Sequence, residues 1–99
     1  MKLRGELKLG DPVNQFRQTM EELIAAGDHN IVISLDELRF MDSSGIGALM
    51  RSFASAKQHS GTIKLVNPTK LVLQTLKLVS VLNLFEVFAD DATAIASFG

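Results

Sequence analysis

The chain has 99 residues, of which 46% are apolar, a formal net charge of −1 and no cysteine. This size and composition predict a single globular domain over residues 1–99 and exclude disulfides and thiolate metal sites. The chain has no broad positive charge and no Trp or Tyr to stack on bases, so we expect no nucleic-acid partner. It shows no signal peptide, so we expect a cytoplasmic protein. It also has no run of about 20 continuous apolar residues, so we expect no insertion into a membrane.

The first predicted elements are a strand and a helix. The segment Leu3–Leu9 alternates apolar and charged residues, and this period of two predicts a strand with one exposed face. Asp11 offers an N-cap and Pro12 a first helical residue, and Gly27 supplies a stop. The apolar face of this helix comprises Val13, Phe16, Met20, Leu23 and Ile24.

The second strand and helix flank the most informative motif of the chain. Ile31–Leu35 is β-branched and apolar, which predicts a buried strand. A helix is predicted after Ser44 and ends at Gly61. Its predicted buried face comprises Ile46, Leu49, Met50, Phe53 and Ala54.

The same alternation continues to the end of the chain. Thr62–Val66 predicts a strand, Asn67–Pro68 the cap and start of a helix, and Leu84–Phe88 a further strand. Asp90 or Asp91 caps a short terminal helix. Strands that alternate with helices predict an α/β fold with a largely parallel sheet and right-handed crossovers.

Leu73 stands apart from the apolar arc of the helix after Pro68. It shares the opposite side with Lys70, Gln74 and Lys77. A single exposed leucine is ordinary, but it could also anchor a contact with another protein. The apolar arc itself comprises Leu71, Val72, Leu76, Leu78, Val79 and Leu82.

The junction Asp42-Ser43-Ser44-Gly45 places two hydroxyls at a helix N-terminus. The unpaired N–H groups and the positive end of the helix dipole there can accommodate an anion such as a phosphoryl group. The motif is therefore consistent with a phosphorylation switch. Asp and Ser are also common N-caps, so a purely structural role is the alternative.

Catalysis and nucleotide binding are not supported by the motifs. Neither serine has the Gly two positions before it that a nucleophile elbow requires. His59 lies about 22 Å along the helix from Ser44, and His29 lies at the far end of the preceding strand, so neither can act as a base. Gly45 and Gly47 lack the third glycine of a dinucleotide fingerprint, because position 50 is Met50. We therefore expect no enzyme activity, no cofactor and no metal site.

Asp42 at a strand end could alternatively mimic the phosphoacceptor aspartate of a receiver domain. The chain is short for that fold, and no acidic pair ends its first strand to hold Mg²⁺.

Four stretches, Phe40–Leu49, Gly5–Leu7, Leu65–Pro68 and Leu82–Phe88, resemble the STAS domain of sulfate transporters and anti-sigma factor antagonists. The similarity is greatest to single-domain bacterial anti-sigma factor antagonists. It implies a mixed sheet of four to five strands with about four helices packed mainly on one side. The family's first strand is missing here.

The resemblance implies a partner and a modified residue. The serine after the aspartate, here Ser43, would be phosphorylated by an anti-sigma factor that is also a serine kinase using ATP and Mg²⁺. Asp42, Ser44 and Gly45 would support this loop. The unphosphorylated protein would bind the kinase and release the sigma factor, and phosphorylation would end that binding.

Two departures from the family pattern affect the expected partner. The missing strand leaves the edge at Lys2–Leu9 unpaired, so we expect partnering there, which a second copy of the chain could supply as a homodimer. Lys8 stands where many members have Asp, which reverses a charge near the partner surface. The expected partner-contact residues are Lys8, Ile46, Ala48, Arg51, Ser52 and Leu73.

Other functions remain open at this level. The chain could be a STAS accessory subunit of an ABC-type lipid or solute transporter, with the serine serving only as an N-cap. It could also be a scaffold subunit of a signalling assembly.

Overall fold

The computed structural model describes residues 1–27 and 30–98. His29, considered above as a base, lies outside the described residues. The four described strands form one sheet in the order β1-β2-β3-β4. The elements are β1 Lys2–Leu7, α1 Asp11–Ala25, β2 Asn30–Met41, α2 Ser43–Gln58, β3 Thr62–Val66, α3 Lys70–Leu78, the 3₁₀ helix η1 Leu82–Leu84, β4 Glu86–Phe88 and α4 Asp91–Ala96.

The α/β class and the strand–helix alternation are confirmed. Every pairing among the described strands is parallel, so the antiparallel strand of a mixed sheet is not found among them. A parallel neighbour can be reached only by a crossover, and a helical segment joins each successive pair of strands.

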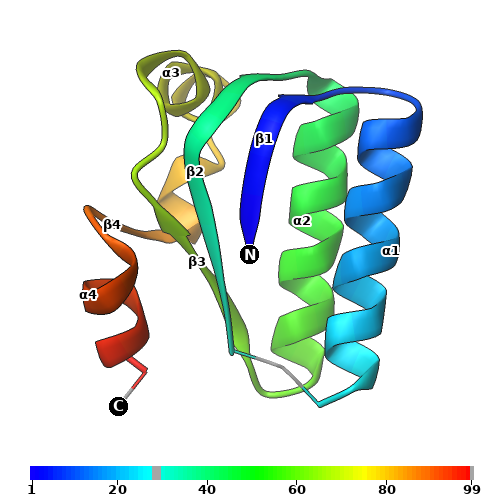
Figure 1. Cartoon of the computed structure of the whole chain (residues 1–99), viewed down its shortest axis with the longest axis vertical. Coiled ribbons are helices and arrows are strands. Elements are labelled where there is room, and N and C mark those ends of the chain that lie inside the picture. The colour runs from blue at the N-terminus through cyan, green and yellow to red at the C-terminus, as the bar shows by residue number, and fades with distance from the viewer. Residues whose placement is uncertain (28–29, 99) are drawn as a thin grey trace.

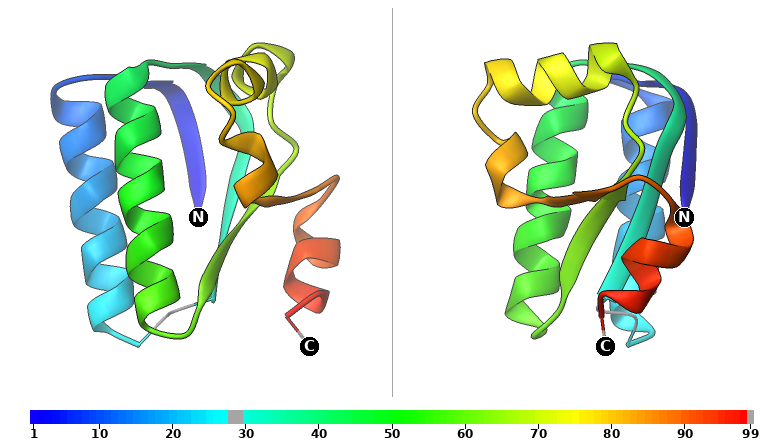
Figure 2. Two further views of the ribbon diagram at one scale, coloured as in Figure 1. Left: turned by 180° about the vertical axis from the view of Figure 1, so that it is seen from behind. Right: turned by 90° about the vertical axis from the view of Figure 1, so that its left-hand side faces the viewer.

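The helices form layers on the two faces of the sheet. α1 and α2 lie side by side on one face, α4 lies against the other, and α3 lies across the ends where the strands finish (Figures 1 and 2). Successive right-handed crossovers in one direction place α1 and α2 on the same face. Among the described residues no helix is both long and apolar enough to cross a membrane.

The core lies between the sheet and the layer of α1 and α2. Ile33, Leu35, Leu49 and Leu65 are completely buried there. β2 is longer than the predicted Ile31–Leu35, because it continues beside β1 as far as Met41. β3 has the predicted bounds, whereas β4 is shorter than predicted because Leu84 belongs to η1.

Three helix starts test the capping predictions. Gly10, with φ 111°, is the N-cap of α1, so Asp11 is the first helical residue and not the cap. Thr69 caps α3 by accepting from Val72 N–H at 3.4 Å, which corrects the start predicted at Asn67–Pro68. Of the two predicted caps of α4, Asp90 is the cap and Asp91 is the first helical residue.

The buried face of α2 differs from its predicted apolar face. The buried residues include the small residues Gly45, Ala48, Ser52 and Ala56, whereas Ala54 is exposed. α2 contacts both the sheet and α1, so small side chains lie where the backbones approach closely. Ile46, Met50 and Phe53 are half-buried at the margin.

The apolar arc of α3 is narrower than predicted. Val72 and Leu76 are buried, but Leu71 and Leu78 are 51% and 85% exposed. α3 lies across the end of the sheet, so it packs on one narrow side only.

Lys64, a buried cation on the sheet face opposite α1 and α2, binds the residues that follow α4. Lys64 is only 5% exposed, and its Nζ lies 4.1 Å from the centroid of the Phe98 ring and 3.6 Å from Glu86. It also donates to the Ser97 hydroxyl. These partners compensate the charge that burial would otherwise leave unpaired.

Candidate functional site

Asp42 organises the junction between β2 and α2. As the N-cap of α2, it accepts from Gly45 N–H through Oδ1 at 2.8 Å. Its Oδ2 accepts from Leu9 N–H at 3.0 Å, and its own N–H donates to the Leu7 carbonyl at 3.1 Å. One carboxylate therefore joins the start of α2 to the segment that leaves β1.

These hydrogen bonds also determine the ionisation of Asp42. Donation from Leu9 N–H, followed by donation from Gly45 N–H, lowers the pKa of the Asp42 carboxyl below its ordinary value of 3.8. The charged form is the one that accepts both bonds, so Asp42 is ionised at neutral pH.

The lowered pKa of Asp42 predicts a pH dependence of stability. A depressed folded-state pKa contributes stability above the ordinary value of 3.8, and this is lost as pH falls through the folded pKa. Asn can still cap α2 through its one carbonyl oxygen, but Asp42→Asn removes the charge and also replaces the oxygen that accepts from Leu9 N–H by an amide NH2 donor. The variant should be less stable than the parent at pH 7, and the difference should shrink by pH 3 in urea denaturation.

The exposed Glu21→Gln provides the matched control, since it removes a carboxylate remote from this junction. An Asp42→Asn difference that stays constant from pH 7 to pH 3 would contradict the prediction.

Ser43 is exposed at the first position of α2, and Ser44 is half-buried behind it. The alternative that serine is the N-cap is wrong, because the Asp42 carboxylate occupies that role. Within the described part of the chain, the Ser43 hydroxyl forms no hydrogen bond. The hydroxyl is thus open to solvent beside the helix N-terminus.

Gly45 and Gly47 serve different purposes in the first turn of α2. A Cβ at Gly45 would lie 2.4 Å from the Leu7 carbonyl oxygen and 3.0 Å from the Met41 side chain, so only glycine permits this approach of α2 to β1. A Cβ at Gly47 would meet only the Arg51 guanidinium, at 3.8 Å. Arg51 therefore reaches back over Gly47 toward the exposed end of the helix that carries Ser43.

The expected partner-contact residues fall into two groups. Lys8 and Arg51 are exposed and Ile46 is half-buried, and all three can contribute to an outer surface. Ala48 and Ser52 are 2% and 7% exposed, which corrects their assignment to the outer face of the helix. They line a small groove of about 140 Å³ between α2 and α1, where Arg17 and Met20 face them.

Two leucines also differ from expectation. Leu73, predicted to be exposed, is half-buried in α3, so its value as a partner anchor is reduced. The strand predicted over Leu3–Leu9 is shorter than expected, because β1 ends at Leu7, and Leu9 is 76% exposed. Its backbone is bonded to Asp42, so this apolar side chain lies next to the Ser43 loop. The turn sequence Gly10-Asp11-Pro12 directly after Leu9 was the available signal.

Nothing in the described residues adds a catalytic group to this junction. His59 lies at the opposite end of α2, where its Nδ1 is 2.8 Å from the Ser55 carbonyl oxygen. Among the residues described, no group of three or more His, Asp or Glu side chains is placed to hold a metal ion.

Comparison with known proteins identifies the fold. The family model of the STAS domain matches residues 2–94. The solved structure of the anti-sigma factor antagonist SpoIIAA in its unphosphorylated form superposes with a TM-score of 0.86 at 26% identity, covering 98% of this chain and 84% of that one. A Thermotoga maritima protein assigned as an anti-sigma factor antagonist gives 0.83 at 18% identity, covering 97% and 80%. No curated protein matches the sequence.

Proposed function

This chain belongs to the STAS domain family, and we propose that it is an anti-sigma factor antagonist controlled by phosphorylation of Ser43. The exposed Ser43 hydroxyl beside the Asp42 cap, in a chain similar to SpoIIAA, carries this proposal. The partner would be a cytoplasmic anti-sigma factor with serine kinase activity that uses ATP and Mg²⁺. The chain itself would bind and would catalyse no reaction.

The surface around Ser43 supports a protein contact. Ser43 and Arg51 are exposed on α2, and Lys8 and Leu9 are exposed where β1 ends. The hydrogen bond from Leu9 N–H to Asp42 holds the two segments together. A partner could therefore contact an apolar side chain, two cations and the target hydroxyl on one end of the domain.

The same geometry explains how phosphorylation could end binding without unfolding the domain. A phosphoserine adds a charge of about −1.5 to −2. The N-terminus of α2 tolerates this charge, and the Ser43 side chain has room in solvent. In a complex, the phosphate and the Asp42 carboxylate would bring two adjacent negative groups into a desolvated contact.

Mapping of the phosphate tests the assignment of the site. Incubation with a kinase-type anti-sigma factor, ATP and Mg²⁺ should add one phosphate to Ser43 and none to Ser44, as measured by fragmentation mass spectrometry. Ser44 is half-buried behind the helix start, which restricts its approach to a kinase.

Ser44→Ala serves as the control and should still be modified, whereas Ser43→Ala should not. Modification of Ser44, or of both serines equally, would contradict the proposed site.

A further inference from the structure

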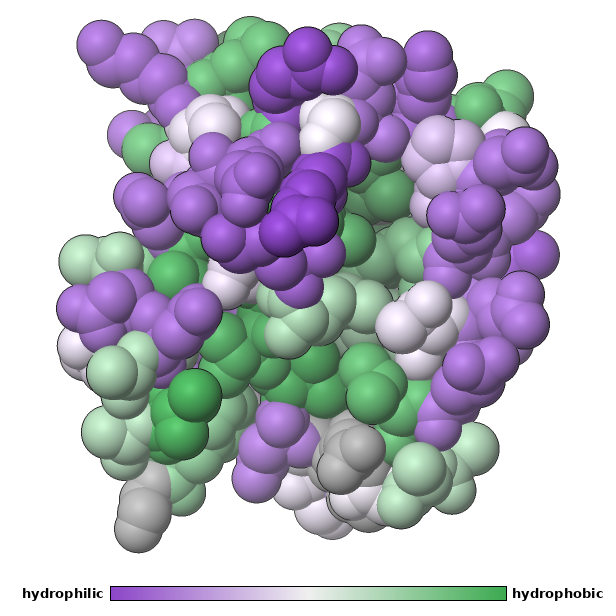
Figure 3. Space-filling view, viewed as in Figure 1, coloured by the Kyte–Doolittle hydropathy of each residue, from purple (hydrophilic) through white to green (hydrophobic). Residues whose placement is uncertain are grey.

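Among the described strands β1 forms one edge of the sheet, and an open groove runs along it. The groove has a volume of about 600 Å³ and is lined by residues 1–8, by Pro12, Gln15, Phe16 and Thr19 of α1, and by Leu38 and Arg39 of β2. Figure 3 shows an apolar hollow between β1 and α1, bordered by hydrophilic residues. The groove therefore combines an exposed strand edge with an apolar wall.

The outer edge of β1 carries backbone N–H and C=O groups that can pair with another strand. The Met1 and Leu7 carbonyls accept from Ser34 and Asp42 N–H of the neighbouring chain segment, at 2.8 and 3.1 Å. Backbone groups of alternate residues point to opposite sides of a strand, so those of Lys2, Arg4 and Glu6 point toward the open edge. Both register shifts in this pair place the extra residue in β2, so β1 has no inserted residue, although Gly5, at φ 77°, leaves the extended conformation at its centre.

The side chains of β1 suit an antiparallel copy of the same strand. When the two strands are centred on Gly5, Arg4 lies opposite Glu6 of the second copy, and Leu3 lies opposite its Leu7. Arg4 and Glu6 are both on the exposed face, whereas Leu3 and Leu7 are on the core face. Opposite charges and apolar pairs that face each other across strands are stabilising.

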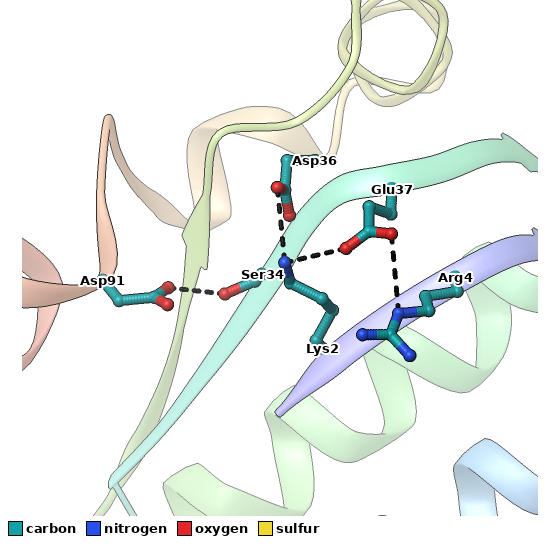
Figure 4. Close-up of polar contacts among 6 residues, drawn as sticks. All are labelled: Lys2, Arg4, Ser34, Asp36, Glu37 and Asp91. Carbon is teal, nitrogen blue, oxygen red and sulfur yellow. Dashed lines mark hydrogen bonds and ion pairs between the residues drawn. The ribbon is translucent and has the colours of Figure 1, made fainter.

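Neighbouring registers are less favourable. Centring on Arg4 pairs Lys2 with Glu6 but places two arginines opposite each other and Leu3 opposite Gly5, so the apolar pair is lost. Centring on Glu6 places two glutamates opposite each other and Arg4 opposite Lys8. In the Gly5 register, Lys2 faces Lys8 at the ends of the contact. Lys2 has an acidic partner in its own chain, since its Nζ lies 2.9 Å from Glu37, and Glu6, which lies 3.3 Å from Lys8, is shared between Lys8 and Arg4 of the second copy. Figure 4 shows Lys2 and Arg4 directed toward Glu37 of β2.

We infer that two copies of this chain form a dimer by antiparallel pairing of β1 with β1, centred on Gly5, so that each edge fills the groove of the other copy. The twofold axis runs through the sheet, which continues from one copy into the next. β1 lies at the outer edge of the sheet (Figure 2), and the groove between it and α1 would receive the added strand.

The assembly closes at two copies. Each β1 edge is used once, and the opposite sheet edge, β4, has only three residues, Glu86–Phe88. A short edge with few backbone groups gives little support for further strand addition. The contact is therefore isologous and does not extend into a filament.

Charge reversal with rescue tests this register. Light scattering and sedimentation should show a dimer for the parent chain and slow amide exchange at Arg4 and Glu6. Arg4→Glu replaces two attractive pairs by two repulsive ones and should weaken the dimer about tenfold or more. The double variant Arg4→Glu/Glu6→Arg exchanges the charges across the contact and should bind more tightly than Arg4→Glu alone, although it also loses the ion pairs of Arg4 with Glu37 and of Glu6 with Lys8 within each chain. Lys70→Glu, the same reversal on exposed α3, should have no effect.

Three outcomes would overturn the inference. The first is a chain that stays monomeric at several hundred micromolar, with fast amide exchange at Arg4 and Glu6. Binding of an extended peptide from another protein by such a monomer would equally refute the homodimer. The second is a dimer that Arg4→Glu leaves unchanged. The third is a double variant that dimerises no more tightly than Arg4→Glu. Ser43→Asp should leave the dimer intact, so this contact and the proposed switch fail independently.

Discussion

Ser43→Asp is expected to weaken binding of the anti-sigma factor about 100-fold, whereas Ser43→Ala should bind as the parent does. The aspartate places a second carboxylate next to Asp42, which already accepts from Leu9 N–H and Gly45 N–H. A charge without a partner in a close contact costs several kcal/mol, and about 2.7 kcal/mol corresponds to 100-fold. Isothermal titration calorimetry with the isolated kinase measures both variants.

Stability distinguishes this effect from unfolding. Ser43 is exposed and is not the N-cap, so neither variant should lower the melting temperature appreciably. An acidic residue at the start of a helix is favourable by about 0.3–1 kcal/mol, so Ser43→Asp should melt at the same temperature or slightly higher. Equal affinity of the Ala and Asp variants would refute the switch.

Gly45→Ala is expected to destabilise the domain by about 3 kcal/mol, because overpacking of a rigid contact costs about 1–3 kcal/mol and the obstacle here is backbone. The new methyl would lie 2.4 Å from the Leu7 carbonyl oxygen, so α2 must move away from β1. For a domain of this size, such a loss lowers the melting temperature by roughly 12–24 °C. Urea denaturation gives the free energy directly.

Gly47→Ala is the matched control in the same turn of the same helix. Its methyl would meet only the flexible end of Arg51, at 3.8 Å. Alanine is favoured over glycine in a helix by about 0.5–1 kcal/mol, so this variant should be as stable as the parent or slightly more stable. If both glycine variants had the same stability, the close approach of α2 to β1 would not be the reason for Gly45.

The two glycines illustrate what a motif conveys and what it leaves out. The sequence places Gly45 and Gly47 in the first turn of a helix and does not distinguish them. Only the position of Leu7 relative to α2 shows that one is required for packing and the other leaves space above the helix.

The N-cap of α2 likewise depends on tertiary structure. Asp42, Ser43 and Ser44 are all suitable caps by residue type. The carboxylate of Asp42 reaches Gly45 N–H and also Leu9 N–H, a donor that belongs to a distant part of the chain. The hydrogen bond from Leu9 N–H favours Asp42 as the cap and leaves Ser43 exposed. Ser43, which by sequence could be either an N-cap or a phosphorylation site, is therefore a candidate for modification.

Periodicity, turn residues and motifs are local properties of the chain, so the sequence alone predicts the order of the strands and α-helices, the position of Ser43 at a helix start and the family, but not the 3₁₀ helix η1. Tertiary structure decided which helix residues are buried. Ala48 and Ser52 are buried because they lie against α1. A helical wheel could not predict this, because it shows how apolar a face is and not which elements pack on it. Tertiary structure also decided that β1 has an open groove beside it, because a strand edge is free or covered only once all other elements have been placed.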